Sequence, residues 1–171
     1  MSVRKLSSTL HGVGRRLLHT NRAITYTQNG SPSSVLRVSS YPALSDPRPD
    51  TLNIRFLLSP VNPADVNVIE GVYPSKPSKV HLGWDGAEEA LVGGNEGVAV
   101  VTSVGSTTGQ LKKGDWVVMT RPQVGTWSSE RNVAITDVLK VKDAEDKSEA
   151  LSEVFAATMT VIARLFTQPS H

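Results

Sequence analysis

Between residues 23 and 142 the chain is divided into short apolar runs, each ended by glycine, proline or another turn-forming residue. Several runs alternate apolar and polar residues, and this period is typical of strands that bury one face. The spacing between the runs is irregular, which favours a partly open β-barrel over a sandwich of evenly spaced hairpins. The sequence therefore predicts a mainly β domain, which we place at residues 23–148.

Turn residues and periodicity locate the predicted strands. Asn29-Gly30 lies at the centre of a turn signal and predicts a hairpin within residues 23–41. Further strands are expected over four stretches, of which the last holds two short strands: 52–61, 97–105, 115–120 and 131–142. A long loop is expected over 73–92, because glycine and proline breakers and an acidic patch interrupt this stretch.

Two helices are predicted beside these strands. The segment 62–71 is compatible with a short helix that has Asn62 as its cap and Pro63 at its first position. A C-terminal helix is expected after a capping box formed by Asp146 and Glu149. The apolar residues of that helix share one face: Leu151, Val154, Phe155, Met159, Ile162, Leu165 and Phe166.

Residues 1–22 have the composition of a mitochondrial transit peptide. The segment is rich in Arg, Ser and Thr, and residues 1–45 contain no Asp or Glu. Four apolar residues recur at helical spacing with bases largely between them: Leu6, Leu10, Val13 and Leu17. Mitochondrial import selects basic amphipathic helices of this kind, so the sequence predicts a protein of the mitochondrial matrix. A disordered basic tail is the alternative interpretation.

Composition excludes several classes of site. The chain has no cysteine, which rules out disulfides, cysteine nucleophiles, iron–sulfur clusters and thiolate zinc sites. Its four histidines lack the paired spacing of a metal site, and no apolar run approaches the roughly 18 residues of a membrane span. Six of the 18 bases lie in residues 1–45, which leaves 12 against all 16 acids in 46–171. This balance argues against a nucleic-acid-binding protein.

Five motifs follow one another along the chain in a diagnostic order. They are SPVNPADVNVIEGVYPSKP (59–77), GGNEGVAVVTSVGS (93–106), LKKGDWVVM (111–119), GTWSSERNV (125–133) and AATMTV (156–161). Together they resemble the N-terminal domain of the medium-chain dehydrogenase/reductase superfamily. More narrowly, they resemble its mitochondrial 2-enoyl thioester reductases, also called enoyl-[acyl-carrier-protein] reductases. The resemblance covers roughly residues 23–161 and implies a GroES-like β-barrel, followed in the family by a Rossmann domain.

The resemblance also implies a reaction and a catalytic residue. Family members use NADPH to reduce the double bond of a trans-2-enoyl thioester carried on acyl-carrier protein or CoA. By its position in GVYPSKP, Tyr73 corresponds to the tyrosine that stabilises the enolate and helps supply the α-proton. A phenol with a pKa of about 10 stays protonated near neutral pH, and an O–H donor is worth most where charge develops. A tyrosine that only packs in its loop is the alternative.

One substitution separates this chain from the zinc-dependent members of the superfamily. Those enzymes place a histidine before the glutamate of a GHEG motif and also use cysteines. Here Asn95 stands at the histidine position, and the chain has no cysteine. The sequence therefore resembles the zinc-free branch, in which a protein hydrogen-bond donor must polarise the carbonyl group. Glu96 is expected to order its loop.

Further site residues are implied by the family's cleft, each with a simpler alternative. Asn62 and Asn67 are expected to touch cofactor or substrate, or else to serve as a helix cap and an exposed helix position. Trp127 is expected to form the floor of the acyl cleft, or to be buried in the barrel core. The pair Lys112-Lys113 could attract an acidic acyl-carrier protein, although a solvated turn explains it as well.

The resemblance ends before the chain does. No glycine-rich strand–turn–helix fingerprint of a dinucleotide-binding domain is present. Residues 149–171 are expected to form a helix that would lead into the family's Rossmann domain, with a divergent sequence from residue 162. The expectation is a truncated substrate-side domain of an enzyme of mitochondrial fatty acid synthesis, inactive alone, whose full-length form would be a homodimer. A non-enzymatic GroES-like binding or regulatory module and a zinc-free quinone reductase are the alternatives.

Overall fold

The computed structural model describes residues 21–74, 77–82 and 88–141. In chain order its elements are β1 (Asn21–Tyr26), α1 (Pro32–Val35), β2 (Arg37–Tyr41), β3 (Thr51–Leu58), α2 (Pro63–Glu70), β4 (Lys79–Leu82), β5 (Glu88–Val92), β6 (Val98–Val104), β7 (Trp116–Met119), β8 (Glu130–Ala134), η1 (Ile135–Asp137) and β9 (Val138–Lys140). Residues 1–20 of the predicted transit peptide and the predicted C-terminal helix lie outside the described residues.

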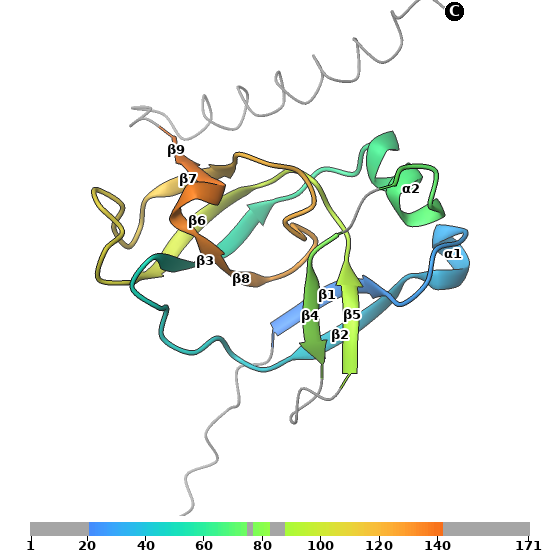
Figure 1. The fold of residues 1–171 in the computed structure, drawn as a ribbon, viewed down its shortest axis with the longest axis horizontal. Coiled ribbons are helices and arrows are strands. Elements are labelled where there is room, and N and C mark those ends of the chain that lie inside the picture. Colours follow the sequence, from blue (N-terminus) through green and yellow to red (C-terminus); the bar gives the residue numbers. More distant parts are fainter. Residues whose placement is uncertain (1–20, 75–76, 83–87, 142–171) are drawn as a thin grey trace, which may run out of the picture.

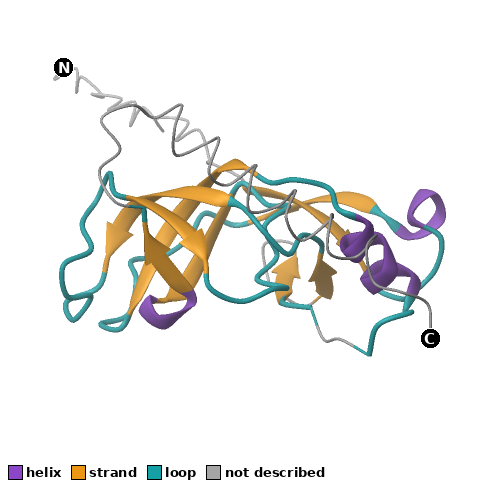
Figure 2. Ribbon diagram, turned by 90° about the horizontal axis from the view of Figure 1, so that it is seen from above, coloured by secondary structure: helices purple, strands orange, loops and turns teal. Residues whose placement is uncertain are grey.

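The described strands form two antiparallel sheets (Figure 1). One sheet has the strand order β2-β1-β5-β4 and the other has the order β8-β3-β6-β7-β9. Neither sheet closes on itself, because each order begins and ends on a different strand. Helices α1 and α2 lie together at one end of the molecule in both views (Figure 1 and Figure 2). This architecture confirms the predicted mainly β fold with a partly open barrel.

Each sheet has its own buried apolar cluster. The cluster of the five-stranded sheet consists of Leu52, Ile54, Ala99, Val101, Val117, Val124, Val133 and Val138. The cluster of the four-stranded sheet consists of Ala23, Tyr41, Val80, Leu82, Ala90 and Val92. Burial of a large apolar side chain stabilises a fold by about 1.5–3 kcal/mol, so these two clusters hold together a chain that has no disulfides.

Most of the predicted elements are confirmed. Strands β1 and β2 pair as the predicted hairpin, although β1 begins at Asn21 rather than at residue 23. The other predicted strand stretches contain β3, β6, β7, β8 and β9. Helix α2 begins at Pro63 after the cap residue Asn62. The sequence does not predict α1, because four residues are too few to show a helical period.

The prediction of a long loop over 73–92 is wrong, because this stretch contains β4 and β5. Val80 and Leu82 are buried on one face of β4, and its other residues are exposed. Strand β5 pairs with β4 on one side and with β1 on the other, where Thr25 faces Val92. Strands this short gain their stability from cross-strand partners distant in sequence, so the local pattern does not reveal them.

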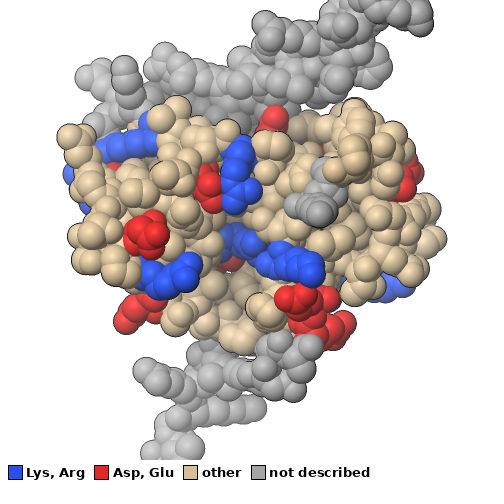
Figure 3. Space-filling view, viewed as in Figure 1, with Lys and Arg blue, Asp and Glu red and all other residues tan. Residues whose placement is uncertain are grey.

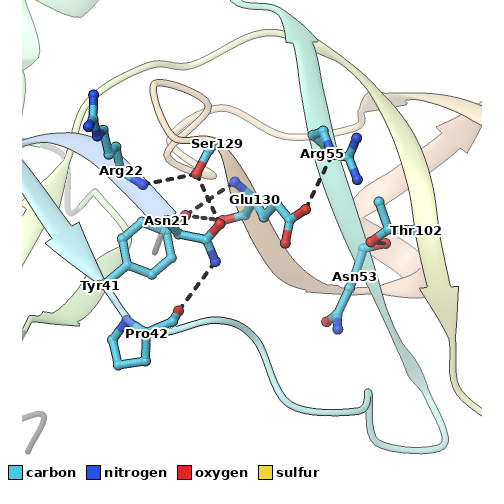
Figure 4. Close-up of polar contacts among 9 residues, drawn as sticks. All are labelled: Asn21, Arg22, Tyr41, Pro42, Asn53, Arg55, Thr102, Ser129 and Glu130. Carbon is cyan, nitrogen blue, oxygen red and sulfur yellow. Dashed lines mark hydrogen bonds and ion pairs between the residues drawn. The ribbon is translucent and has the colours of Figure 1, made fainter. Parts of the chain in front are cut away.

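A network of polar contacts joins the two sheets between β1, β2 and the start of β8 (Figure 4). The hydroxyl of Ser129 donates to Asn21 Oδ1 at 3.1 Å and accepts the backbone N–H of Arg22 at 2.9 Å. The hydroxyl of Tyr41, from the four-stranded sheet, donates to the carbonyl of Glu130 and accepts its N–H at 3.2 Å. Asn21 is fully buried, so the hydrogen bond from Ser129 fixes the first residue of β1 to the start of β8 in the five-stranded sheet.

Charged side chains of both signs are interspersed on the face drawn in Figure 3. Several form ion pairs, among them Lys79 Nζ with Glu89 Oε2 at 2.8 Å and Arg121 Nε with Asp137 Oδ1 at 2.7 Å. Exposed pairs of this kind contribute little to stability, because solvent screens the two charges. None of the helices in the described residues has the length and apolar character that a membrane crossing requires.

Removing the hydroxyl group from either of two buried tyrosines, Tyr26 and Tyr41, is expected to have different effects on the free energy of unfolding. The hydroxyl of Tyr26 has no hydrogen-bond partner in the described part of the chain, and burial raises its pKa above the ordinary value. We expect Tyr26→Phe to leave the free energy of unfolding unchanged or to increase it, because it removes an unsatisfied buried group. We expect Tyr41→Phe to lower it by about 1–3 kcal/mol, because it leaves the backbone groups of Glu130 unpaired. Urea unfolding of both variants measures the difference, and equal losses would contradict the prediction.

Candidate active site

The N-terminal end of helix α2 is held by the carboxylate of Asp65, which is only 2 % exposed. Its Oδ2 accepts the backbone N–H of Asn62 at 2.7 Å, as in a capping box. Its Oδ1 accepts the backbone N–H of Asn95 at 3.0 Å, thirty residues further along the chain. Burial raises the pKa of Asp65 and the charge of Glu96 adds to that rise, whereas the two backbone hydrogen bonds lower the pKa. The carboxylate therefore ties α2 to the loop 93–97.

The C-terminal end of α2 places Tyr73. Gly71 adopts a left-handed conformation with φ of 80°, which ends the helix at little cost for glycine. The carbonyl of Asn67 accepts the backbone N–H of Val72 at 2.9 Å and that of Tyr73 at 3.4 Å. Tyr73 is 39 % exposed, and among the described residues no hydrogen bond engages its hydroxyl. The turn thus fixes the backbone and leaves the phenol accessible.

The same end of the helix is also capped from outside. The side-chain amide of Asn29 donates to the carbonyls of Val68 and Ile69, both at 3.0 Å. The backbone N–H of Gly30 also donates to Ile69, at 3.0 Å. The hairpin is closed by the longer connection 27–36, which includes α1, and not by a tight turn at Asn29-Gly30. Within this connection Asn29 and Gly30 satisfy the last carbonyls of α2, which would otherwise lack partners.

A second contact joins the start of α2 to the loop 93–97. Asn62 Nδ2 donates to Glu96 Oε2 at 3.2 Å, and the hydroxyl of Thr126 donates to the carbonyl of Glu96 at 2.8 Å. The side chain of Asn95 accepts the backbone N–H of Gln123 at 3.1 Å. Residues of three segments are therefore assembled here: the cap of α2, the loop 93–97, and the loop before β8.

Trp127 is half-buried on the surface of this assembly. Its indole N–H donates to the carbonyl of Pro60 at 3.0 Å, and its backbone N–H donates to the carbonyl of Gly93 at 3.0 Å. The ring lies against Gly93 and Gly94 so closely that a Cβ at either position would overlap it. Trp127 also lines an open groove of about 360 Å³, together with Arg22, Ala23, Ile24, Val38, Ser59, Thr126, Ser128 and Ser129.

The sequence-predicted residues thus lie in two groups. Asn62 and Trp127 lie close in the chain fold, because Trp127 contacts Pro60, two residues before Asn62. Tyr73 and Asn67 belong to the other end of α2, and an eight-residue helix is about 12 Å long. Asn62 and Asn67 are five residues apart, which places them about 140° apart around the helix. The backbone carbonyl of Asn67 accepts the N–H groups of Val72 and Tyr73.

Two residues of the assembly were not anticipated. Asp65 follows Asn62 by three residues, and this spacing is a recognisable capping-box signal. Its bond to Asn95 has no such signal, because it depends on how α2 packs against a distant loop. Asn29 is likewise recognisable only as a turn residue. Among the described residues no group of three His, Asp or Glu side chains could hold a metal ion.

Comparison with known proteins places this arrangement in a family. Residues 48–135 match the model of the alcohol dehydrogenase GroES-like domain. The chain belongs to this family. The matched region of the GroES-like domain runs from just before β3 to the start of η1 and so contains α2, the loop 93–97 and Trp127.

Curated relatives of this GroES-like domain share further similarity. An enoyl-[acyl-carrier-protein] reductase 2, mitochondrial, from Candida tropicalis is 38 % identical over 152 residues, which cover 85 % of this chain and 39 % of the relative. A mitochondrial enoyl-[acyl-carrier-protein] reductase from Schizosaccharomyces pombe is 37 % identical over 163 residues, which cover 94 % of this chain and 40 % of the relative. The chain therefore spans about two fifths of the length of these relatives.

Solved structures agree with the sequence comparison. The structure of an Etr1p complex with NADP and crotonyl-CoA superposes with a TM-score of 0.65 at 39 % identity. The superposition covers 72 % of this chain and 34 % of that one. The GroES-like domain is thus similar in sequence and in structure to the corresponding part of an enoyl thioester reductase.

The contact between Gly93 and Trp127 can be tested by adding one methyl group. We expect Gly93→Ala to displace the indole ring and to lower the free energy of unfolding by about 1–3 kcal/mol, the usual cost of overpacking. The tryptophan emission spectrum should change with it. Gly109→Ala is the matched control, because a Cβ there meets open space and only its positive φ is strained. An unchanged emission spectrum in Gly93→Ala would contradict the prediction.

Proposed function

We propose that this GroES-like domain is the substrate-side, catalytic part of an NADPH-dependent reductase of trans-2-enoyl thioesters in mitochondrial fatty acid synthesis. Support comes from relatives that are mitochondrial enoyl-[acyl-carrier-protein] reductases and from Etr1p, whose structure was solved with NADP and crotonyl-CoA. The thioester would be carried on acyl-carrier protein or CoA, and the protein would act in the mitochondrial matrix after removal of its transit peptide.

The observation that carries this proposal is the presentation of Tyr73. Its backbone is fixed by the carbonyl of Asn67 at the end of a capped helix, while its side chain is 39 % exposed. A phenol that only packed in the loop would be covered by neighbouring side chains. A fixed backbone with a partly exposed side chain is instead what a hydrogen-bond donor to a bound ligand requires.

The chemistry follows from where charge develops. NADPH, when bound, supplies the hydride that adds to the β-carbon of the enoyl group. Negative charge then builds on the thioester oxygen, and we assign Tyr73 to donate its O–H to that oxygen and to help deliver the α-proton. A phenol O–H is a hydrogen-bond donor of the kind that this oxygen requires. No Lewis acid is needed in this scheme, and we propose that the enzyme uses no zinc.

The remaining site residues are assigned by chemistry of their side chains. Asn62 and Asn67 carry uncharged amides that suit polar groups of a nicotinamide cofactor, and we propose that each borders a different part of it, because the two residues lie about 140° apart around α2. Trp127, Ile24 and Val38 give the groove of about 360 Å³ a largely apolar lining, which suits an acyl chain. Since an Etr1p/Etr2p heterodimer is among the similar structures, we propose a dimer as the assembly of the full-length form.

The proposal predicts a specific effect of Tyr73→Phe. Crotonyl-CoA should bind about threefold to tenfold more weakly to the variant, because one neutral hydrogen bond contributes about 0.5–1.5 kcal/mol. Isothermal titration calorimetry measures this affinity. In an assay of NADPH oxidation with the same thioester, the rate for Tyr73→Phe should be lower by about a hundredfold or more. The missing hydrogen bond is the one that strengthens as charge develops on the thioester oxygen.

Tyr26→Phe is the matched control for this experiment. It removes the same hydroxyl from a side chain that is 2 % exposed and therefore cannot contact the ligand directly. We expect wild-type affinity for that variant. If Tyr73→Phe also binds crotonyl-CoA as tightly as the wild type, the catalytic assignment fails and a non-enzymatic binding module becomes the better interpretation. If the wild type does not bind the thioester at all, the proposed substrate is wrong.

A further inference from the structure

Helix α2 is held at both ends, so its two ends move as one unit. At the start, the carboxylate of Asp65 accepts the N–H of Asn62 at 2.7 Å. At the end, the left-handed Gly71 and the carbonyl of Asn67 fix the turn that leads to Tyr73. With only eight residues between the caps, a shift at the start of α2 is transmitted to Tyr73 with little chance of being absorbed.

Asp65 also decides where this unit lies relative to the rest of the site. Its Oδ1 accepts the N–H of Asn95 at 3.0 Å, and the Asn95 side chain accepts the N–H of Gln123 at 3.1 Å. The next residue along, Glu96, accepts a hydrogen bond from Asn62 at 3.2 Å. One buried carboxylate thus sets the separation between α2 and the loop 93–97, against which Trp127 packs.

The chemistry of this contact requires a carboxylate. Both partners of Asp65 are backbone N–H donors, and no ion pair of Asp65 is found within the described residues. An ionised carboxylate presents two oxygens that both accept, whereas an amide presents one acceptor and one donor. An asparagine of the same shape would therefore set an N–H₂ group against an N–H, and one of the two contacts would be lost.

We propose that Asp65 is a positioning residue for the reaction, because it sets the place of Tyr73 relative to the loop that carries Asn95 and supports Trp127. This inference rests on the proposed function for its catalytic meaning. It assigns Asp65 no contact with substrate. Without both of its hydrogen bonds, the hydroxyl of Tyr73 would no longer lie where the thioester oxygen is bound.

The test compares Asp65→Asn with a matched control, Asp115→Asn. Asp115 is 7 % exposed and accepts the N–H of Lys112, three residues earlier, at 3.0 Å, so it repeats the local geometry of Asp65. Its other oxygen pairs with Lys140 Nζ at 3.1 Å, outside the candidate site. Both variants lose a buried acceptor, but only Asp65→Asn is expected to change the site.

The decisive readout is how much the hydroxyl of Tyr73 contributes to ligand affinity in each background. In the wild type and in Asp115→Asn, adding Tyr73→Phe should weaken crotonyl-CoA binding by the same factor of about three to ten. In Asp65→Asn this factor should fall to about one, because the two residues act together. A purely structural role would leave the factor unchanged, and that outcome would overturn the proposal.

A second readout separates this proposal from the proposed function. If the wild type fails to bind crotonyl-CoA, the proposed function fails, and the NMR signal of the ¹³C-labelled Tyr73 ring then decides the positioning role. The ring signal should move in Asp65→Asn and stay in place in Asp115→Asn. An unmoved Tyr73 signal in both variants would overturn the positioning role as well.

A wild-type titration replaces the variant if Asp65→Asn does not fold. Protonation of Asp65 at low pH should shift the amide signals of Asn62 and Asn95 and the ring signal of Tyr73 with one shared midpoint. Glu96 is a second carboxyl group close by, so the titration is repeated in Glu96→Gln. The three signals should still share one midpoint there, at lower pH, because the charge of Glu96 no longer raises the pKa of Asp65. A Tyr73 signal that does not follow the two amides would contradict the proposal.

Discussion

Two backbone N–H groups, those of Asn62 and Asn95, both donate to the carboxylate of Asp65, and the candidate site is arranged around this contact. A buried charge is costly unless hydrogen bonds satisfy it. The bonds from Asn62 and Asn95 meet this need, although burial still raises the pKa of the carboxyl. Because the penalty for an unpaired carboxylate is large, any arrangement that separates α2 from the loop 93–97 is disfavoured. The position of Tyr73 follows from this constraint.

The two open sheets supply the frame on which this contact can form. Polar contacts of Asn21 and Tyr41 with the start of β8 hold the sheets together, and the loop that precedes β8 carries Trp127. The ring of Trp127 then lies against Gly93, where a side chain would leave it no room. Small residues, one indole and one carboxylate therefore determine the distance between the helix and the sheets.

Much of the fold could be predicted from local patterns. The strands β3 and β6 are long and apolar, and Asn62, Pro63 and Gly71 mark both ends of α2 with residues whose backbone preferences are strong. The strands β4 and β5 could not be predicted. They hold four and five residues, and their apolar side chains become buried only when β5 pairs with β1. Short strands are stabilised by partners distant in the sequence, so the local sequence pattern alone does not predict them.

For the site, the sequence by itself determined the chemical groups and their local settings: a tyrosine after a glycine-capped helix, an asparagine cap, a carboxylate three residues behind it, and no cysteine. These depend on backbone preferences and spacing over a few residues, which a single chain segment already contains. Only the tertiary structure decided that Asp65 reaches Asn95, that Asn29 caps α2 from the hairpin, and that Trp127 covers Gly93. Each of these contacts joins residues that are at least thirty positions apart in the sequence. Their formation depends on how the sheets and the helix pack, because hydrogen bonds and ring contacts act over a few ångströms of space, whatever the separation along the chain.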